Sequence, residues 1–332
     1  MKILITGGSG YIGSHAVKIF LEKKYEVVVF DNLSRGFSEP LEILKKFGKL
    51  TFIKGDLRDK KDLEGIFKNH KFEAIIHFAG LCSVNESMEK PEIYFENNSI
   101  ATLNLLEVMK KFDVKKIIFS STCATYGETG DLAVSELHSQ NPTNPYGESK
   151  LMSEKLIKWF GKSYNFQYII LRYFNVCGSE RNGVIGDSKK PSPHLMQNVV
   201  RDAMNIENFS LTCPKVKTKD GTPIRDYIDV EDLAEAHFRA FEHLQKDGKS
   251  DIFNLGNGKG YSVKEIIQEV EKAFKIKIKP QKGATRKGEY AKIFANPKKA
   301  NKILKWKPQK NLQDSIESLR NWYSNFPQGY KK

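Results

Sequence analysis

The chain has 332 residues, of which 39% are hydrophobic and 28% are charged, which suggests about two globular domains and excludes disordered, collagen-like, coiled-coil and disulfide-scaffold proteins. No stretch approaches the roughly 18 consecutive apolar residues that a membrane span needs, and the N-terminal apolar run is too short for a signal peptide, so we expect a cytoplasmic protein with no membrane partner. The net charge is +14. The sequence has no run of about five or six basic residues and no nucleic-acid-binding motif, so this charge indicates a lysine-rich, solvated surface. We therefore expect no nucleic-acid partner.

The first half of the chain alternates between apolar runs and helical periodicity. Strands are expected at 2–6, 25–30, 51–53, 74–78, 116–121 and 168–173. Helices are expected after the first strand, over about 91–111, and after Pro145, which suits the first turn of a helix because its missing N–H has no partner there. Strands that alternate with helices predict an α/β fold with a parallel, doubly wound sheet of the Rossmann type.

The second half is less regular. Residues 176–224 are rich in Gly, Pro, Ser and Lys and show weak periodicity. Helices are expected over 232–243 and 263–274, and a strand over 252–255 is expected to return to the main sheet. We therefore divide the chain into a Rossmann domain, 1–175 plus 224–256, and a smaller, interleaved C-terminal domain, 176–223 and 257–332.

A glycine-rich turn follows the first strand. Gly8, Gly10 and Gly13 fit the pattern GxGxxG between a strand and a helix. Glycine lets the backbone approach a pyrophosphate, and the helix N-terminus offers N–H groups to it. The candidate cofactor-binding residues of this turn are Gly7, Gly10, Tyr11, Ile12 and Gly13.

The second strand ends in Asp31 and Asn32, at about the distance from the turn where an acidic residue binds a ribose 2′-hydroxyl. A carboxylate there would repel a 2′-phosphate, so we predict NAD rather than NADP. Residues that follow the third and fourth strands are expected to flank the adenine and to line the dinucleotide. They are Asp56, Leu57, Phe78, Ala79 and Gly80.

Tyr146 and Lys150 form the pattern YxxxK, which places both on one face of a helix. The pKa of a tyrosine must fall by about three units, on the order of 4 kcal/mol, before it acts as a base near neutral pH. The ammonium of Lys150 and a positively charged nicotinamide would both favour the phenolate. A hydroxyl donor is expected where the fifth strand ends, and we choose Thr122. Tyr146, Lys150 and Thr122 are the predicted catalytic residues.

Several motifs together resemble the extended short-chain dehydrogenase/reductase family: TGGSGYIG (6–13), SST-x-x-x-YG (120–127), PYGESK (145–150) and RYFNVCG (172–178). DNLSRG, GDLRD, HFAGL, DGTPIRDYI and the closing NFPQGY resemble its UDP-glucose 4-epimerase branch, over essentially the whole chain. The resemblance implies reversible C4 epimerisation of UDP-galactose and UDP-glucose. Tyr146 would remove the proton of the sugar 4-hydroxyl, and the C4 hydride would pass to NAD⁺ and return to the other face of a 4-keto-sugar from bound NADH.

The resemblance also assigns the remaining site residues. Lys150 would contact the nicotinamide ribose and Thr122 a sugar hydroxyl, while Asn97 and Tyr173 would lie on the cofactor side. The residues implied around the UDP-sugar are Asn175, His194, Leu195, Arg225, Tyr227, Arg286, Glu289 and Ile293. The resemblance further suggests a homodimer formed by the helices near 91–111 and 145–162.

Some positions depart from the family pattern. Cys82 stands where the family usually has a lysine beside the cofactor, Asp229 replaces a histidine, Glu289 replaces an aspartate, and Thr212-Cys213-Pro214 replaces an aromatic-glycine pair. Ile293 aligns with a residue that gates bulky sugar 2-substituents and is intermediate in size. The alternative substrates are therefore UDP-N-acetylhexosamines, alone or beside the unsubstituted sugars.

Other functions fit the sequence less well. A 4,6-dehydratase is expected to carry Asp-Glu after Thr122, where this chain has Cys123-Ala124. A UDP-glucuronate enzyme would not match the epimerase motifs from end to end. A non-enzymatic NAD-dependent sensor is expected to lose Tyr146 and Lys150. The cysteines form no CxxC pair and the histidines show no metal-ligand spacing, so we expect a reduced compartment and no metal site.

Overall fold

The structure is a computed structural model that describes residues 1–130, 133–190, 192–285 and 290–331. Its strands are β1 (Lys2–Thr6), β2 (Glu26–Asp31), β3 (Leu50–Lys54), β4 (Ala74–His77), β5 (Lys116–Thr122), β6 (Gln167–Tyr173), β7 (Asn175–Cys177), β8 (Ser210–Leu211), β9 (Ile224–Asp229), β10 (Asp251–Leu255), β11 (Gly260–Ser262), β12 (Gln281–Lys282) and β13 (Lys292–Ile293). Its helices are α1 (Tyr11–Glu22), α2 (Glu39–Leu44), α3 (Lys60–Asn69), α4 (Val84–Glu89), α5 (Pro91–Tyr94), α6 (Ala101–Lys111), α7 (Pro145–Tyr164), α8 (Leu195–Ala203), α9 (Val230–Gln245), α10 (Val263–Phe274), α11 (Lys298–Ile303) and α12 (Leu312–Asn325).

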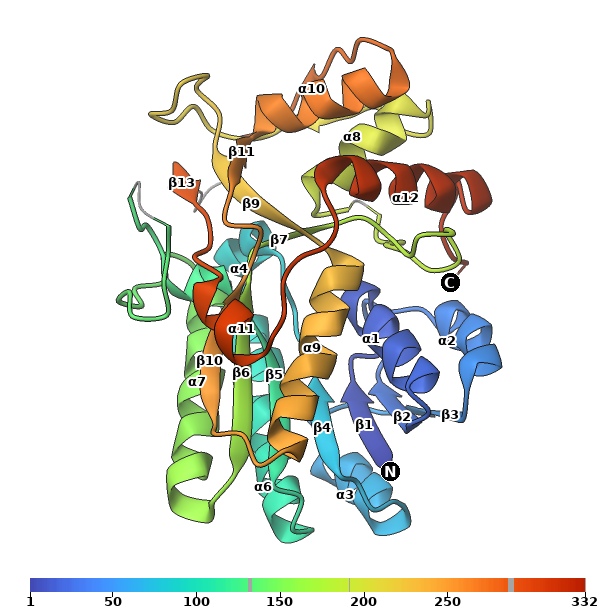
Figure 1. Cartoon of the computed structure of the whole chain (residues 1–332), viewed down its shortest axis with the longest axis vertical. Helices are drawn as coiled ribbons and strands as arrows, with labels where there is room; N and C mark the ends of the chain where they lie inside the picture. Colours follow the sequence, from blue (N-terminus) through green and yellow to red (C-terminus); the bar gives the residue numbers. More distant parts are fainter. Residues whose placement is uncertain (131–132, 191, 286–289, 332) are drawn as a thin grey trace.

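The main sheet is parallel, with the strand order β10-β6-β5-β4-β1-β2-β3. Side chains alternate between the two faces of the sheet along each strand, so apolar strands have two faces to bury, and helices cover both. Ile3 and Ile5 of β1 join the core beneath α1, α2 and α9, whereas Leu4 joins the core beneath α3, α6 and α7. The predicted doubly wound Rossmann sheet is confirmed (Figure 1).

The predicted strands of this sheet agree with the structure to within one residue at either end. The strand expected over 252–255 is β10, and it returns to the main sheet beside β6 as predicted. The helix expected over 91–111 is α5 and α6 joined by a π-helical segment, Phe95–Ile100. That segment lies over the candidate site, where such irregular helical turns are common.

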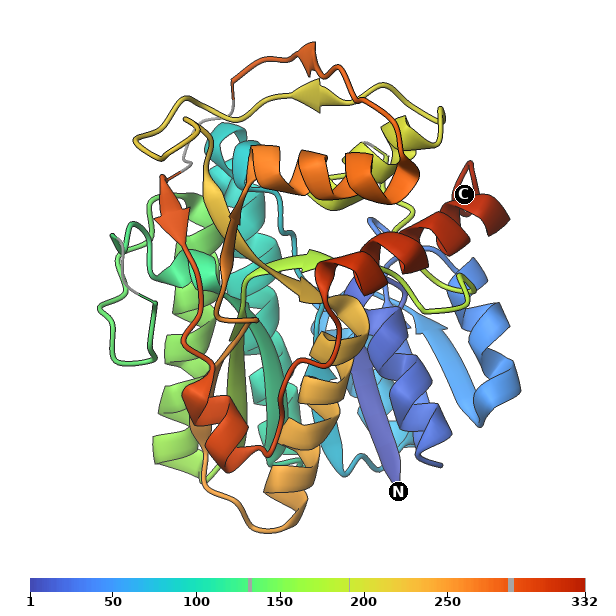
Figure 2. The same ribbon diagram turned by 45° about the horizontal axis from the view of Figure 1, so that its top comes forward.

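The smaller part of the chain is built from short strands that pair across long sequence separations. In the described residues β9 pairs with β7, β11 and β13, and β12 pairs with β8. Helices α8, α10 and α12 share one core, which includes Val199, Ile266 and Leu319. Figures 1 and 2 show this part above the carboxyl ends of the main-sheet strands. A site at those strand ends is therefore enclosed between the two parts.

One predicted boundary differs from the structure. We placed 224–256 with the Rossmann domain, but β9 joins the smaller sheet, and only α9 and β10 return to the main one. The sequence of β9, IRDYID, mixes apolar and charged residues, and it carries no signal that says which sheet the strand joins. No helix in the described residues has the length and apolar character needed to cross a membrane.

Candidate active site

Two hydroxyl groups meet at the carboxyl end of β5. Thr122 is the last residue of β5, and Tyr146 is the second residue of α7, which begins at Pro145. The side chain of Asn144 accepts a hydrogen bond of 2.9 Å from the N–H of Gly147 and so fixes the first turn of α7. The Thr122 side chain lies near enough to the Tyr146 phenol to lower its pKa. The predicted acid/base and the predicted hydroxyl are thus brought together.

Burial dominates the electrostatics of Tyr146, which is 8% exposed. Burial, with repulsion from Tyr173 and Cys82, holds the pKa of the phenol well above its usual value, and the nearby Thr122 side chain opposes that rise. This direction is opposite to the fall that a base near neutral pH requires. The lowering of the pKa must therefore come from positive charge placed against the phenol oxygen.

Lys150 follows one turn later on α7 and is 5% exposed. Its ammonium lies 4.3 Å from the ring centroid of Phe119. A Cβ on Gly80 would lie 3.6 Å from the Lys150 nitrogen, so this glycine leaves room beside the ammonium. Burial lowers the pKa of Lys150 to about 8, while Cys82 and Glu154 act in the opposite direction. The ammonium is therefore poised near neutral pH.

A buried asparagine that the sequence analysis did not single out joins α7 to the loop after β4. Asn98 lies on the π-helical segment, and its amide nitrogen donates to the Leu81 carbonyl and to the Ser149 hydroxyl, each at 3.0 Å. The Leu81 N–H donates back to the amide oxygen at 2.8 Å. The predicted cofactor contact Asn97 is its neighbour and donates to the same oxygen at 3.3 Å. The only signal in the sequence was an Asn-Asn pair within a helix.

A buried ion pair, also missed from the sequence, fixes α7 against β5 and β6. The Arg172 guanidinium donates to both carboxylate oxygens of Glu154, at 2.9 and 2.6 Å. The Ser121 hydroxyl donates to the same carboxylate at 2.6 Å, and Arg172 also donates to the Tyr126 hydroxyl at 2.9 Å. Because Ser121 precedes Thr122, this network holds the strand end and the catalytic helix in one position.

The glycine turn joins three elements closely. Gly7 has φ +72°, in the left-handed region, and a Cβ there would lie 2.5 Å from the backbone nitrogen of Ala79. A Cβ on Gly13 would lie 2.2 Å from the Gly7 carbonyl oxygen. Glycine thus lets β1, the loop after β4 and α1 approach one another. The N–H groups at the start of α1, including those of Tyr11 and Ile12, have no partner within the helix and can bind phosphate.

The side chain of Tyr11 makes its contacts with the smaller part of the chain rather than with the phosphate-binding turn. Its hydroxyl donates to the Gly178 carbonyl at 2.5 Å and accepts from the Gln197 amide at 3.2 Å. Its ring lies 5.4 Å from that of His194. The side chain therefore joins α1 to the smaller part, and the predicted cofactor contact of Tyr11 rests on its backbone N–H.

Asp31 lies where β2 ends, beside the glycine turn. Its carboxylate accepts hydrogen bonds from the N–H groups of Ser9, at 3.1 Å, and Leu33, at 2.8 Å. Burial raises the pKa of Asp31, and these bonds oppose the rise. Asn32 donates to the Asp56 carboxylate at 2.9 Å, so the two predicted adenosine-side residues are also adjacent.

The other predicted cofactor residues line the ends of the neighbouring strands. The Phe78 ring lies 4.4 Å from the His237 ring. The Tyr173 hydroxyl accepts a hydrogen bond of 3.0 Å from Ser120, whose oxygen lies 3.2 Å from His237 Nε2. Leu57 is buried in the core beneath α3 and α6. The sequence did not single out His237, because an isolated histidine within a helix has no motif around it that indicates a functional role.

Arg225 and Ile293 lie side by side on β9 and β13. The Arg225 guanidinium donates to the carbonyls of Ile224, at 2.9 Å, and Tyr290, at 2.8 Å, and lies 4.8 Å from the Tyr290 ring. Ile293 is fully buried and shares a hydrophobic cluster with Cys123, the residue that follows Thr122 in the chain. These strands therefore bring the predicted sugar-gating residue close to the catalytic end of β5.

The remaining predicted UDP-sugar contacts are spread over the smaller part. Asn175 pairs with Tyr227 across β7 and β9, and Tyr227 is buried in the core shared by α8, α10 and α12. His194 is the N-terminal cap residue of α8, and Leu195 is its first residue. Two predicted contacts, Arg286 and Glu289, lie outside the described residues.

Two residues that depart from the family pattern, Cys82 and Asp229, form hydrogen bonds in the structure. Cys82 accepts a hydrogen bond from the Lys189 ammonium, with 3.7 Å between nitrogen and sulfur. Asp229 caps α9 by accepting from the Glu231 N–H at 2.9 Å, and it also accepts from the Ser315 hydroxyl at 2.6 Å. Burial raises the pKa of Asp229 to about 7. Asp229 therefore ties α9 to α12.

The arrangement fits a dinucleotide cofactor. The close backbone approach at Gly7 and the first turn of α1 suit a pyrophosphate, the Asp31 carboxylate suits a ribose diol, and the space at Gly80 lies next to Lys150. Among the described residues, no group of three or more His, Cys, Asp or Glu side chains is arranged to hold a metal ion.

Comparison with known proteins agrees with this fit. Residues 3–256 match the NAD dependent epimerase/dehydratase family. A UDP-glucose 4-epimerase of Halalkalibacterium halodurans is 45% identical in an alignment of 332 positions that covers 99% of this chain and 98% of that protein. A UDP-glucose 4-epimerase of Streptococcus mutans is 41% identical in an alignment of 334 positions that covers 99% of each chain.

A solved structure shows the same architecture. The crystal structure of a UDP-glucose 4-epimerase from Bifidobacterium longum, in complex with NAD⁺ and UDP, has a TM-score of 0.94 and 36% identity, and the match covers 99% of this chain and 100% of that one. The predicted fold, NAD cofactor and epimerase class are confirmed, and the N-acetylhexosamine alternative is not favoured. The chain belongs to the NAD dependent epimerase/dehydratase family.

Proposed function

We propose that this protein interconverts UDP-galactose and UDP-glucose by reversible epimerisation at C4. The observation that carries the proposal is the group formed by Thr122, Tyr146 and Lys150, at the carboxyl end of a central strand and beside the glycine turn. Acid/base and hydroxyl groups at this edge of a parallel sheet lie where such folds bind and transform their ligands. The full-length likeness to UDP-glucose 4-epimerases supports the choice of substrate.

In the proposed reaction Tyr146 moves the proton of the sugar 4-hydroxyl. Burial keeps its phenol protonated, so positive charge must stabilise the phenolate when Tyr146 acts as a base. Lys150 supplies such charge from the same helix, and its pKa of about 8 keeps it mostly protonated at neutral pH. Thr122 lies near Tyr146 and can orient the sugar hydroxyl. NAD, when bound, supplies the reversible acceptor for the C4 hydride.

The smaller part of the chain supports the UDP end of this proposal. Arg225 is fixed by two backbone carbonyls and by the Tyr290 ring, so its planar guanidinium is held in one orientation. A guanidinium held in this way suits diphosphate recognition, because its N–H groups match phosphate geometry. Because Arg225 on β9 pairs with Ile293 on β13, the proposed diphosphate site and sugar pocket lie on two neighbouring strands of one sheet.

The test is turnover of UDP-galactose by the purified protein without added NAD, followed by chromatography of the nucleotide sugars. Conversion to UDP-glucose supports the proposal. Tyr146→Phe is expected to lower turnover at least about hundredfold, the usual contribution of general acid/base catalysis, while the content of bound NAD stays unchanged. Tyr164→Phe, at the exposed end of the same helix, is the matched control and should leave turnover intact. Undiminished turnover in Tyr146→Phe would refute the assignment of the acid/base.

The surface of α7 and of the neighbouring helical segment supports a homodimer. Ile100, Met152 and Trp159 are exposed by 52%, 39% and 63%, and large exposed apolar side chains gathered on adjacent helices are typical of association surfaces. Trp159→Lys should lower the mass measured by light scattering to that of one chain. Leu137→Lys changes an apolar residue on a loop that is even more exposed, at 96%, and this control should leave the mass unchanged. A wild-type mass of one chain would contradict the dimer.

We place the reaction in the cytoplasm, since the four cysteines are free thiols, as is usual in a reducing compartment.

A further inference from the structure

A lysine of the smaller part reaches into the Rossmann part. Lys189 lies between β7 and α8, and its ammonium donates a hydrogen bond to the sulfur of Cys82, in the loop after β4, at 3.7 Å. The two residues are far apart in the sequence, and the contact bridges the two parts of the molecule. A thiol is a weak acceptor, so it leaves most of the positive charge of the ammonium available.

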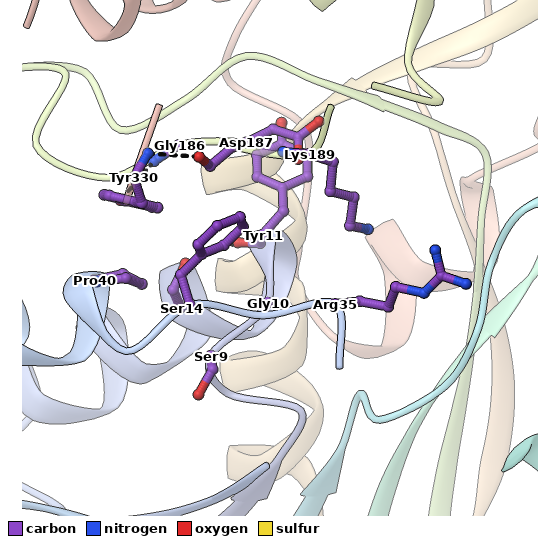
Figure 3. Close-up of a pocket in the computed structure, with 12 residues that line it drawn as sticks. Ser9, Gly10, Tyr11, Ser14, Arg35, Pro40, Gly186, Asp187, Lys189 and Tyr330 are labelled. Carbon is purple, nitrogen blue, oxygen red and sulfur yellow. Dashed lines mark hydrogen bonds between the residues drawn. The ribbon is translucent and has the colours of Figure 1, made fainter. Parts of the chain in front are cut away.

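Lys189 also lines a small pocket against the glycine turn. The pocket includes Ser9, Gly10 and Tyr11 of the turn, together with Arg35 and Lys189. Figure 3 shows the side chains of Arg35 and Lys189 extending to the same side of this pocket, one from each part of the molecule. The lysine therefore stands opposite the backbone N–H groups that begin α1.

The position of Cys82 locates this contact along the cofactor path. Cys82 follows Gly80 by two residues, and a Cβ on Gly80 would lie 3.6 Å from the nitrogen of Lys150, which marks the nicotinamide end. Lys189, on its other side, faces the glycine turn, beyond which Asp31 marks the adenosine ribose end. A dinucleotide that extends from Tyr146 to Asp31 has its pyrophosphate between these ends, where Lys189 lies.

Two cations, Arg35 and Lys189, and one carboxylate, Asp187, line this pocket. The Arg35 guanidinium is already paired with the Glu86 carboxylate at 2.5 Å. The Asp187 carboxylate accepts from the Lys189 backbone N–H, at 3.3 Å, and from the Ser192 hydroxyl, at 2.8 Å. Interaction with Cys82 and, more weakly, with Asp187 raises the pKa of Lys189, so its side chain stays protonated at neutral pH.

We propose that Lys189 binds the pyrophosphate of the NAD cofactor, so that the smaller part of the chain supplies a cation that retains the dinucleotide. The inference rests on the NAD dependence of the family and adds a residue that the glycine-turn motif does not contain. The helix N-terminus would contact the pyrophosphate from the Rossmann side, and the ammonium would contact it from the opposite side. The Cys82 thiol would hold the ammonium in that position.

The test compares Lys189→Gln with Lys190→Gln. Lys190 is the next residue, is exposed, and donates to the Gln328 side chain at 3.0 Å, so its substitution removes the same charge without touching the pocket. Bound NAD is measured by an enzymatic cycling assay after repeated dilution and concentration of the holoenzyme. Lys189→Gln should retain NAD on the order of tenfold less tightly, since a hydrogen bond to a charged group is lost. Lys190→Gln should retain it like the wild type.

Titration of NAD-depleted protein distinguishes the possible ligands. For Lys189→Gln, the affinity for ADP-ribose should fall with that for NAD, whereas the affinities for adenosine, which has no phosphate, and for UDP should not change. A loss confined to UDP would overturn the proposal, because the lysine would then bind the diphosphate of the substrate. Equal NAD retention in both variants would also overturn it. Failure of the wild type to bind NAD would instead contradict the cofactor assignment itself.

A second measurement requires no variant. Cys82 is exposed, and a pyrophosphate held by Lys189 would cover its sulfur. Alkylation of Cys82 by iodoacetamide, followed by peptide mass spectrometry, should be several-fold slower in the NAD-loaded than in the NAD-depleted protein. Cys213, the other cysteine that is not buried, serves as the internal control and should react equally in both. Equal labelling of Cys82 in both forms would place the pyrophosphate elsewhere.

Discussion

The group around Tyr146 and the group around Arg225 are held in place in different ways. Thr122, Tyr146 and Lys150 come from β5 and α7, which are adjacent elements of one Rossmann part and are tied together by the buried Arg172–Glu154 pair. Arg225 lies on a short strand whose neighbours come from distant segments of the chain. The proton-transfer group is thus preorganised by one core, whereas the UDP end depends on how the smaller part assembles.

Breaking the buried Arg172–Glu154 ion pair should have the largest effect on the free energy of unfolding. Glu154→Gln leaves the Arg172 guanidinium buried without a counter-charge, and the free energy of unfolding should fall by about 3–5 kcal/mol. Chemical denaturation monitored by circular dichroism measures the loss. Glu235→Gln breaks the exposed pair with Arg239, at 2.8 Å, and should cost less than about 1 kcal/mol.

A double variant separates charge from packing. Glu154→Gln combined with Arg172→Met removes both buried charges, so part of the stability should return relative to Glu154→Gln alone. If the double variant is no more stable than the single one, the unpaired charge is not the cause of the loss. Turnover of both variants well below their melting temperatures then reports whether the pair also positions Thr122.

These contacts explain how far the sequence could predict the molecule. The central strands of the main sheet, such as β1, β2 and β4, are buried on both faces and read as apolar runs, so they were predicted to within a residue. The pairing of Ile224 with Lys292 in the smaller sheet joins segments that carry no common signal. Asn98 and Glu154 lie on helices, where a polar residue is expected to face solvent, and only the three-dimensional contacts show that both are buried.

The candidate site was predictable to the extent that motifs carry it. The glycine turn and the YxxxK pattern singled out Gly7, Tyr146 and Lys150, because the chemistry requires those residue types at that spacing, and the roles of these residues stay predictions. The direction of the Tyr146 pKa was not predictable, since it depends on burial by neighbouring elements rather than on the motif. The side chain of Tyr11 is likewise directed to the smaller part by Gly178, which is remote in sequence.

The next prediction concerns the pH dependence of turnover. Burial lowers the pKa of Lys150 to about 8, so the ammonium loses its proton as the pH rises through that value. Turnover should then fall by about tenfold for each further pH unit, because the charge that favours the Tyr146 phenolate is lost. Lys155→Gln, on the exposed face of the same helix, should keep this alkaline fall. A rate that stays flat to pH 10 would refute the role of Lys150.

Loss of the Lys150 proton, which should lower turnover, should raise the stability of the fold. Unfolded Lys150 keeps its proton up to its ordinary pKa of 10.5, whereas folded Lys150 releases it near pH 8. Between these values the unfolded chain binds more protons, so the contribution of this residue to the free energy of unfolding rises with pH. Lys150→Met should lose that rise, which denaturation at pH 7 and pH 9.5 in both proteins would measure.

The smallest effect is expected at the helix caps, and it compares the two parts directly. Asn144 caps α7 and Asn311 caps α12, in each case by accepting hydrogen bonds from backbone N–H groups of the first turn. Replacement of either by alanine should lower the free energy of unfolding by about 1 kcal/mol. Only Asn144→Ala should also lower kcat, because Tyr146 stands in the first turn that Asn144 fixes, whereas Asn311 lies on the helix that closes the smaller part. Steady-state kinetics beside chemical denaturation of both variants measures the two effects. A similar fall of kcat in both variants would show that the catalytic geometry responds to general stability, and that the first turn of α7 holds no special place in it.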